Sequence, residues 1–384
     1  MGAVIPRGRC AAAAVLAMAL ALAWSAARVH YTNGGNWTAL FCTGAGVPLP
    51  SELNAGTYRV PPTGGYDGQF YRLLAHDPAL RKGYAHYVDA PRFRFRRALV
   101  PWMAWLLAMG SDRWVDGAYI AVEMLFVALG VYWCARLVAR RGRSPWWGLL
   151  FLAVPATIAS VDRMLLDGPL TAWFAGFLLY CEEGRWRRVW ILAALAGLTR
   201  ETGLPMAAAL AGDRLWRRDW RGAARFTACA VPALAWYAYV ARLPGDSLSE
   251  IGFPLWALLR RLLIFRTYFN PLGQVVLRVT DFLAVAGLIA CLLLAAIWLA
   301  KTKIGPAWLG VALYACLALV LGPPVMMDPF AFGRVVSPLL VWVLMEAISR
   351  RKWIAMAAPL AIGLNVSLVF VRPAITIAQT LWKR

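Results

Sequence analysis

An aspartate stands out in the stretch "GGYDGQFYRLLAHDP", residues 64–78, because 61% of the 384 residues in this chain are hydrophobic. Asp67 lies between a tyrosine and a glycine, and its carboxylate could act as a general base or as a metal ligand. The apolar positions that follow have a helical period, which predicts a short amphipathic helix beginning after Asp67. Asp is also a favoured N-cap residue, so a capping role fits the same position.

Arginines interleaved with aromatic residues follow in "DAPRFRFRRALVPW", residues 89–102. Guanidinium groups bind phosphate oxygens bidentately, and aromatic rings suit the headgroup zone of a membrane. Arg94, Arg96 and Arg97 are therefore candidate ligands of a lipid-linked phosphate. Plain anchoring to anionic headgroups is the alternative for any one of them.

Further charged residues stand where apolar segments begin or end. In "VDRMLLDGPLTAW", Arg163 and Asp167 have the spacing of an ion pair on one helix face. Asp167 also starts an apolar segment beside a Gly-Pro break, where a carboxylate is costly unless it has a function. Arg200 and Glu201 separate two short apolar segments, and short broken helices at membrane depth line cavities or are buried in protein. For Arg334, a contact with phosphate and simple snorkelling of the side chain to the membrane interface are equally good interpretations.

The apolar segments predict an all-α polytopic membrane protein. They approach the roughly 20 residues that cross a bilayer and lack the alternating polarity of barrel strands. The net charge is +21, and clusters of arginine at the ends of these segments fit the cytoplasmic residues that orient a membrane protein, rather than a nucleic-acid partner. About eleven spans are predicted, at residues 11–29, 116–138, 145–161, 164–181, 189–199, 203–212, 226–241, 276–300, 306–322, 335–348 and 354–371.

Basic residues also set the predicted orientation. With Arg7 and Arg9 inside, the first span runs outward, and residues 30–115 form a long first loop on the outer side. Residues 98–110 are too short to cross and are expected to form an interfacial helix. The unusual polar residues then gather at the outer face of one transmembrane domain, 1–384. A transporter would place such groups near the membrane midplane, so this arrangement favours a reaction at the outer interface.

The motifs resemble the GT-C superfamily of integral-membrane glycosyltransferases. The resemblance is closest to bacterial proteins of cell-surface glycopolymer formation that carry a YDGQFY motif in the first loop, here at residues 66–71, followed by an arginine-rich stretch, here at 94–101. It implies a GT-C-like bundle with short amphipathic helices in the first extracytoplasmic loop. It also implies a catalytic acid at Asp67 and a second acid at Asp167.

The same resemblance implies the substrates and the roles of residues. The donor would be a polyprenyl-phosphate-linked sugar, and the acceptor a saccharide, a lipid or a protein of the cell envelope. In an inverting displacement Asp67 would act as the general base. The donor phosphate would be bound by Arg94, Arg96, Arg97, Arg163, Arg200 and Arg334. Further substrate contacts are expected from Tyr66, Gln69, Tyr71, His76 and Glu201.

Two features depart from this family or stay open. Many relatives have two adjacent acids in the first loop, whereas Gly68 follows Asp67 here, which argues against a bridging metal ion. No HExxH or CxxC motif predicts a metal site, and participation of a divalent metal ion stays open.

The alternative functions are a transporter or flippase for a lipid-linked saccharide and a non-catalytic scaffold. The excess of Arg over Lys is typical of GC-rich bacterial genomes. The resemblance implies the bacterial cytoplasmic membrane as the location, with the site facing the periplasm or exterior.

Overall fold

The computed structural model describes residues 7–60, 64–245, 250–263 and 271–383. Within these residues the regular structure is helical, with two isolated β-bridges and no strand. The all-α part of the prediction is therefore confirmed.

The elements divide into a first helix, a series of short helices, and a longer helical part. With η for 3₁₀ helices, the first two groups are α1 (Arg7–Thr32), η1 (Trp37–Phe41), α2 (Ser51–Asn54), α3 (Gly68–His76), η2 (Tyr84–Tyr87), α4 (Pro91–Arg94) and α5 (Leu99–Leu107). The third group is α6 (Asp112–Arg140), η3 (Pro145–Ala153), α7 (Pro155–Arg163), α8 (Asp167–Glu182), α9 (Trp186–Thr199), η4 (Glu201–Gly203), α10 (Leu204–Trp216), α11 (Trp220–Thr227), η5 (Ala228–Ala230), α12 (Val231–Val240), α13 (Trp256–Leu263), α14 (Pro271–Leu299), α15 (Pro306–Leu319), α16 (Pro323–Met326), α17 (Pro329–Val335), α18 (Ser337–Ser349), η6 (Trp353–Met356), α19 (Ala357–Ser367), η7 (Leu368–Phe370) and α20 (Val371–Trp382).

Several helices are long and apolar enough to cross a bilayer. Among the described residues four qualify, namely α1, α6, residues Val275–Leu299 of α14, and the stretch Trp353–Trp382. Two bent pairs qualify only as pairs, η3 with α7 at 61° and α17 with α18 at 70°, which raises the number to six if each pair is one span. The second helix of each pair has a proline in its first turn, which interrupts the hydrogen bonding of a continuous helix. The chain is a multi-pass membrane protein, whereas eleven separate spans are not confirmed.

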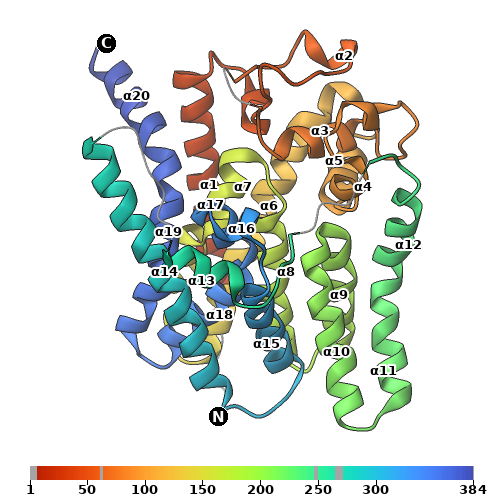
Figure 1. The fold of residues 1–384 in the computed structure, drawn as a ribbon, viewed down its shortest axis with the longest axis vertical. Helices are drawn as coiled ribbons and strands as arrows, with labels where there is room; N and C mark the ends of the chain where they lie inside the picture. Colours follow the sequence, from red (N-terminus) through yellow and green to blue (C-terminus); the bar gives the residue numbers. More distant parts are fainter. Residues whose placement is uncertain (1–6, 61–63, 246–249, 264–270, 384) are drawn as a thin grey trace.

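Short helices occupy several of the predicted spans. α8, α9 and α10 have 16, 14 and 13 residues, fewer than the roughly 20 needed to cross alone. The last predicted span, 354–371, belongs to a helical stretch that continues to Trp382. In Figure 1 consecutive segments still run alternately toward the two ends of the long axis, α8 and α10 in one direction and α9 in the other.

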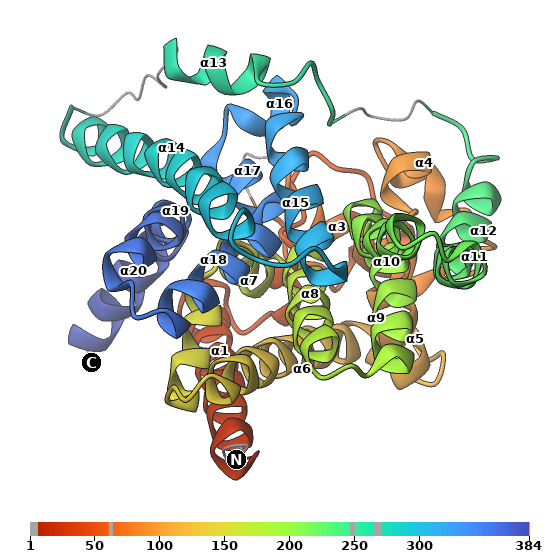
Figure 2. The ribbon, with the colours of Figure 1, turned by 90° about the horizontal axis from the view of Figure 1, so that it is seen from below.

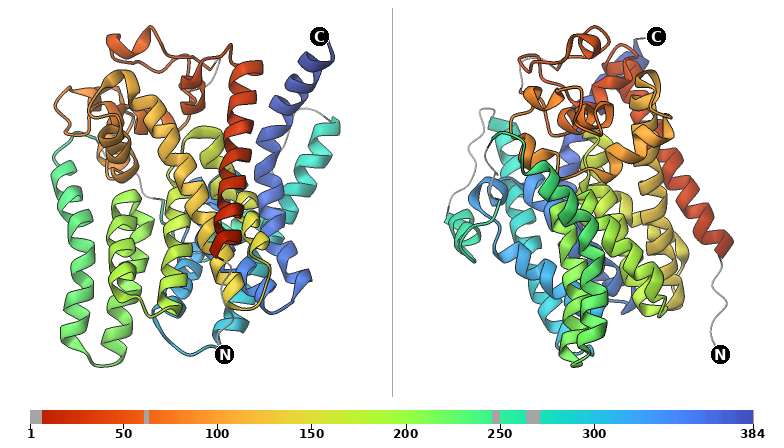
Figure 3. Two further views of the ribbon diagram at one scale, coloured as in Figure 1. Left: turned by 180° about the vertical axis from the view of Figure 1, so that it is seen from behind. Right: turned by 90° about the vertical axis from the view of Figure 1, so that its right-hand side faces the viewer.

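The described residues between α1 and α6, 33–60 and 64–111, gather at one end of the molecule (Figures 1 and 3), and we refer to them together as the region 33–111. It has a small core of its own, in which Phe95 and the apolar face of α3 contact Val240 of α12. α5 coincides with the predicted interfacial helix and packs on α3 and α6. The backbone N–H of Ala98 donates to the carbonyl of Leu198 at 2.9 Å, so the region is docked directly on the end of α9.

The main core forms around α6 and α8. α6 packs against α1, η3 and α8, and α14 packs against α19. Seen along the long axis in Figure 2, α7, α8, α17 and α18 lie inside, and α1, α12, α13 and α20 lie at the periphery. The ends of these inner helices meet the region 33–111, and polar side chains at that junction can be shielded from both lipid and water.

Candidate functional site

Asp67 immediately precedes α3, as predicted, but does not cap it. Its side chain makes no capping hydrogen bond to the first turn of the helix. The carboxylate instead lies 2.9 Å from Nη1 of Arg94 and 3.9 Å from Nη1 of Arg334. Of the two roles that fit this position, the side-chain cap is therefore not formed, because charged donors at the same junction bind a carboxylate more strongly than a neutral backbone N–H does.

Gly68 brings the start of α3 into direct contact with the end of α7. A Cβ atom at this position would lie 2.1 Å from the carbonyl oxygen of Arg163 and 3.1 Å from that of Phe41. The backbone of this chain therefore has no room for a second acid beside Asp67. The departure from the first-loop pattern of the resembled family thus has a packing reason.

Gly68→Ala is expected to destabilise the protein and to move Asp67 away from its arginines. The added methyl group must push α3 away from a backbone oxygen, and overpacking of this kind costs about 1–3 kcal/mol. The measurement is thermal unfolding of the purified variant in detergent. Gly64→Ala is the matched control, because a Cβ there meets nothing within 4 Å. Equal stability of the two variants would contradict the close contact.

Asp167 is the first residue of α8, and only 3% of its side chain is exposed. One carboxylate oxygen accepts a hydrogen bond from Nη1 of Arg200, and the other lies 3.3 Å from Nη1 of Arg334. The helix N-terminus also favours a negative charge at this position. Asp167 therefore holds together two arginines, one from the end of α9 and one from α17.

The predicted pairing of Arg163 with Asp167 is wrong. α7 ends at Arg163, and Met164 has a left-handed backbone with φ of 51°, so the chain changes direction before α8 begins. A spacing of four residues brings side chains together only within one helix. Arg163 instead lies 3.1 Å from Asp162, which also binds Arg28 of α1 at 2.5 Å.

Arg97 is fully buried and binds three oxygen atoms. Its Nε and Nη2 donate to the two carboxylate oxygens of Glu201 at 3.0 and 2.5 Å, and Nη1 donates to the hydroxyl of Tyr71 at 2.6 Å. The ring of Phe93 lies 4.4 Å from the guanidinium carbon. This bidentate pair joins the arginine-rich stretch of the first loop to the predicted break between α9 and α10, where η4 begins.

Glu250 belongs to the same cluster and was not among the residues predicted from sequence. Its Oε2 accepts a hydrogen bond from Nη2 of Arg200 at 3.2 Å, and its Oε1 lies 3.8 Å from Nη2 of Arg97. It lies in the long segment between α12 and α13. No motif or spacing marks it, and its one sequence signal is an acidic side chain in a predicted outer loop.

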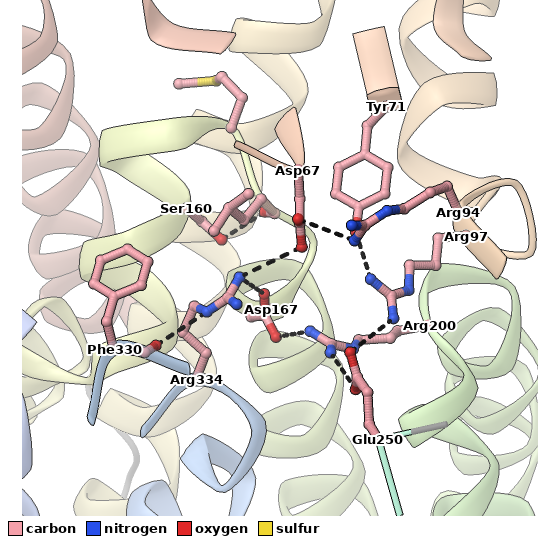
Figure 4. Close-up of polar contacts among 12 residues, drawn as sticks. Asp67, Tyr71, Arg94, Arg97, Ser160, Asp167, Arg200, Glu250, Phe330 and Arg334 are labelled. Carbon is pink, nitrogen blue, oxygen red and sulfur yellow. Dashed lines mark hydrogen bonds and ion pairs between the residues drawn. The ribbon is translucent and has the colours of Figure 1, made fainter. Parts of the chain in front are cut away.

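Together these side chains form a chain of alternating charges, drawn for the most part in Figure 4. They come from six separate stretches of the sequence and meet where the region 33–111 covers the ends of α8, α9 and α17. We name them the junction cluster. In order of contact its eight members are Arg94, Asp67, Arg334, Asp167, Arg200, Glu250, Arg97 and Glu201.

An aromatic pair supports one side of the cluster. The rings of Tyr66 and Phe330 are perpendicular, with centroids 5.5 Å apart. The guanidinium carbon of Arg163 lies 4.4 Å from both rings, and that of Arg334 lies 5.1 and 5.3 Å from them. Such cation–π contacts favour fixed positions of both cations. Arg334 also donates from Nε to the carbonyl of Phe330 at 3.0 Å, so its orientation is set from two sides.

Six predicted site residues are not members of the junction cluster. Tyr66 and Tyr71 contact its arginines, and Arg163 lies on the ring of Tyr66, whereas His76, Gln69 and Arg96 have other partners. The ring nitrogens of His76 are 2.9 and 3.2 Å from two carboxylates of α6. Gln69 hydrogen-bonds backbone groups of the region 33–111. The guanidinium carbon of Arg96 lies 5.8 Å from the ring of Tyr237. The structure therefore brings together Asp67, Asp167 and most of the predicted arginines, with Tyr66 and Tyr71 in contact with them.

Burial and the neighbouring arginines act in opposite directions on the acids of the cluster. Burial alone would raise the pKa of Asp67, but the four arginines, Arg94 first, outweigh it and hold that pKa below its usual value. The same opposition lowers the pKa of Glu201 to about 2. Both carboxylates are therefore charged at neutral pH. Burial raises the pKa of Tyr66 to about 12, so its phenol stays protonated.

The carboxylates of the cluster do not fit a metal ion. In the described part of the chain, no group of three or more His, Cys, Asp or Glu side chains could hold one. Divalent cations need several oxygen ligands. The carboxylates of Asp67 and Asp167 are already paired with arginines, and Nη1 of Arg334 lies within ion-pair distance of both. Arg334 therefore supplies positive charge at the position between the two acids.

A second charged network lies at the opposite end of the molecule, near the C-terminal ends of α6 and α8 (Figure 1). Its ion pairs join Arg136, Arg140 and Arg141 to Glu182, Glu183 and Glu346. A cleft of about 530 Å³ opens beside it. The expectation that costly polar groups gather at one face only is therefore wrong, because the arginines that end α6 pair with acids that end α8 and α18.

Comparison of the chain with protein-family models, with curated proteins and with solved structures finds no match. The function must therefore be inferred from the geometry of the junction cluster and from the motifs of the sequence.

Proposed function

We propose that the protein is a membrane glycosyltransferase of the GT-C type, which moves a sugar from a polyprenyl-phosphate donor to a hydroxyl group of a cell-envelope acceptor. The observation that carries the proposal is the junction cluster, where the partly exposed carboxylate of Asp67 lies in the field of four guanidinium groups at the ends of apolar helices. Guanidinium groups bind phosphate, and a carboxylate can accept the proton of an attacking hydroxyl. The YDGQFY motif, which includes Asp67, supports the same conclusion.

The proposed reaction is an inverting displacement at the anomeric carbon of the donor. The acceptor hydroxyl, from a saccharide, a lipid or a protein, forms the new carbon–oxygen bond while the bond to the phosphate oxygen breaks. Asp67 takes the hydroxyl proton, and the polyprenyl phosphate leaves with the electron pair of the broken bond. Arginines of the cluster stabilise the negative charge that develops on the leaving phosphate. No step of this reaction requires a metal ion.

The two predicted catalytic acids have different roles in this proposal. The side chain of Asp67 is 19% exposed, and that of Asp167 only 3%. Both oxygens of Asp167 bind arginines and the side chain is almost completely buried, so an acceptor hydroxyl has less access to it than to Asp67. We assign the general base to Asp67, and Asp167 becomes a positioning residue that fixes Arg200 and Arg334.

Arg94→Gln is expected to move the acidic limb of the transfer rate to higher pH. Arg94 is the strongest of the charges that lower the pKa of Asp67, so without it the carboxylate protonates at a higher pH. A general base works only in its deprotonated form. At about pH 5, near the usual range of a carboxyl group, the variant should therefore lose a larger share of its maximal kcat/KM than the wild type does.

The control for this pH profile is Arg113→Gln, a charge change at the start of α6, where the guanidinium stacks on Trp114. It should leave the acidic limb in place. Superimposable acidic limbs for Arg94→Gln and the wild type would contradict the assignment of Asp67 as the base.

The proposal places the junction cluster at the extracytoplasmic face of the bacterial cytoplasmic membrane. The short helices α8, α9 and α10 would then cross together with the longer ones and complete the eleven-span arrangement. Two arginine-rich connections support this orientation, namely α8 to α9 and α10 to α11, because they lie at the end opposite the region 33–111 (Figures 1 and 3). Such residues favour the cytoplasmic side.

Sugar transfer itself is the test of the proposed function. Purified protein in nanodiscs is incubated with a radiolabelled polyprenyl-phosphate sugar and with candidate saccharide, lipid and protein acceptors. Labelled acceptor together with released polyprenyl phosphate supports the proposal. The proposal would be contradicted if protein that binds prenyl phosphate does not consume the donor when cell-envelope fractions are present.

A second candidate function is transport of a lipid-linked saccharide across the membrane. The network and cleft at the opposite end of the molecule favour it, since a translocation path needs polar groups on both sides. Proteoliposomes separate the two functions. A transporter would move a fluorescent lipid-linked saccharide between leaflets without consuming it, whereas a transferase would release prenyl phosphate and leave the distribution between leaflets unchanged.

A further inference from the structure

One carboxylate in the junction cluster lies between two arginines that the reaction needs. Oε2 of Glu250 is 3.2 Å from Nη2 of Arg200, and Oε1 is 3.8 Å from Nη2 of Arg97. Both guanidinium groups are almost completely buried, whereas 28% of the Glu250 side chain is exposed. Figure 4 shows Glu250 at the lower edge of the drawn side chains, beside Arg200.

The eight members of the junction cluster carry no net charge without a ligand, and the exposed Asp89, which also pairs with Arg94, adds a further acid beside them. The eight members are four acids and four arginines, and the chain of contacts alternates between them. A phosphate group adds at least one negative charge. Binding it in this shielded place while all four acids stay would leave excess negative charge, which is costly away from water. Phosphate binding is therefore easiest if one acid moves out.

The contacts of the four acids identify Glu250 as the one that can leave. Asp167 is buried and bound through both oxygens, and Glu201 holds Arg97 through two hydrogen bonds. Asp67 is the proposed base and must stay. Among the described residues, Glu250 accepts a single side-chain hydrogen bond, from Arg200. Of the three acids other than the proposed base, Glu250 would therefore break the fewest of these hydrogen bonds on leaving.

The main chain at Glu250 and on its C-terminal side is hydrogen-bonded to the segment before α16, so the movement can be limited to the side chain. The carbonyl of Glu250 accepts a hydrogen bond from Gly322 at 2.7 Å, and Gly252 donates to Val320 at 2.8 Å. The segment continues into α13, where Arg261 pairs with an acid of α14. Rotation of a partly exposed side chain is fast, on the picosecond to nanosecond scale. The carboxylate can thus turn outward without unfolding the segment that carries it.

We propose that the Glu250 carboxylate occupies the phosphate subsite of the resting protein and that the phosphate group of the substrate displaces it from Arg97 and Arg200. A carboxylate and a phosphate present similar oxygen atoms to guanidinium groups, and both accept paired hydrogen bonds. This inference rests on the proposed function, since the phosphate is that of the prenyl-linked donor. It assigns phosphate binding to these two arginines, and it leaves Arg94 and Arg334 to orient Asp67.

Glu250→Gln tests the displacement directly. The variant keeps the size of the side chain and removes the charge that competes with phosphate. Apparent affinity scales with the fraction of time for which the subsite is free. If the wild-type subsite is free for about a tenth of the time, removal of the Glu250 charge should therefore tighten binding of farnesyl phosphate by about tenfold. Farnesol, which lacks the phosphate, should bind both proteins equally. The measurement is calorimetric titration in nanodiscs, with Glu250→Ala as a second variant expected to change in the same direction.

Two matched controls separate displacement from a general effect of charge. Glu201→Gln removes an equal charge beside the same arginines but also a bidentate partner of Arg97, so it should not tighten farnesyl phosphate binding. Glu346→Gln, at the opposite end of the molecule, should change nothing. Equal or weaker binding by both Glu250 variants would overturn the inference, as would a gain at Glu201→Gln as large as that at Glu250→Gln.

The same experiment distinguishes the source of the phosphate and the fate of the proposed function. Tighter binding of farnesyl phosphate than of inorganic phosphate supports a lipid-linked ligand, whereas equal affinity would overturn that part. If Glu250→Gln binds farnesyl phosphate more tightly but the protein transfers no sugar, the phosphate subsite is supported and the glycosyltransferase function is contradicted. If the wild type transfers sugar but neither Glu250 variant binds farnesyl phosphate more tightly, displacement of Glu250 by phosphate is contradicted and the glycosyltransferase function is supported.

Discussion

Asp67→Asn should lower the rate of sugar transfer by about 10²–10⁴-fold, the usual contribution of a positioned general base. Asparagine has the shape of aspartate but cannot accept the proton of the attacking hydroxyl. The neighbouring arginines remain in place, because Arg94 keeps its pairing with Asp89 at 3.0 Å and Arg334 keeps its pairing with Asp167. The loss should therefore appear in kcat, with thermal unfolding of the purified variant close to that of the wild type.

Asp89→Asn is the matched control for this loss. Asp89 binds the same arginine as Asp67, but its side chain is 48% exposed, and exposed ion pairs contribute little. We expect a change in turnover of no more than a few-fold. Near wild-type turnover of Asp67→Asn would remove that residue from the chemistry. An equal loss in both variants would show that the position of Arg94, rather than a base at Asp67, controls the rate.

Binding gives a further readout for Asp67→Asn. The acid is not a proposed phosphate ligand, and its neutralisation leaves the cluster with an excess of positive charge. Farnesyl phosphate should therefore bind the variant at least as tightly as it binds the wild type. A variant that binds well and turns over slowly has lost an interaction specific to the transition state. Loss of binding together with turnover would instead indicate a disturbed site.

Local patterns in the sequence predicted much of this site because the relevant elements are short and their residue types are unusual. The turn before α3 is marked by glycine and by the onset of a helical period, and α3 begins at Gly68 as expected. Costly charges at the ends of apolar segments identified Asp167, Arg200 and Arg334, and all three belong to the junction cluster. The physical reason is that an ionisable group beside lipid needs a partner or a function.

Tertiary geometry explains the errors. The spacing of Arg163 and Asp167 describes one helix, but the left-handed backbone at Met164 separates them into two. Asp67 has a suitable position for a cap, and only the approach of Arg334 from α17 shows why it takes ion pairs instead. Glu250 could not be identified at all, because a single acid in a long connecting segment has no local pattern. Its role follows from the backbone pairing that brings its segment beside α16.

The number of spans could not be decided by length alone. α8, α9 and α10 are shorter than a bilayer requires, yet they are covered at one end by the region 33–111 (Figure 1). Helices of this length place their ends at the level of the junction cluster. The shortness that makes these segments poor independent spans is therefore what provides a shielded place for four arginines and four acids.

Asp167→Asn should be the most destabilising single change in the junction cluster. The substitution leaves two buried guanidinium groups, those of Arg200 and Arg334, without their shared acid. Breaking a buried ion pair by removal of one partner costs about 3–5 kcal/mol. The measurement is the free energy of unfolding in mixed micelles with increasing dodecyl sulfate. Sugar transfer should fall as well, because both arginines lose their fixed positions.

A double-mutant cycle then separates the structural role of Asp167 from a catalytic one. In the double variant Asp167→Asn with Arg200→Met, neither partner of that ion pair is charged. We therefore expect the double variant to be less destabilised than the sum of the two single variants, by a coupling energy of about 1–3 kcal/mol. Transfer should not recover, because Arg200 is a proposed phosphate ligand. The control pair is Asp213 with Arg217, whose side chain is 56% exposed, and its coupling should stay below about 1 kcal/mol. Additive losses at Asp167 and Arg200 would contradict the buried pair, and recovery of transfer in the double variant would contradict the assignment of Arg200 to the phosphate.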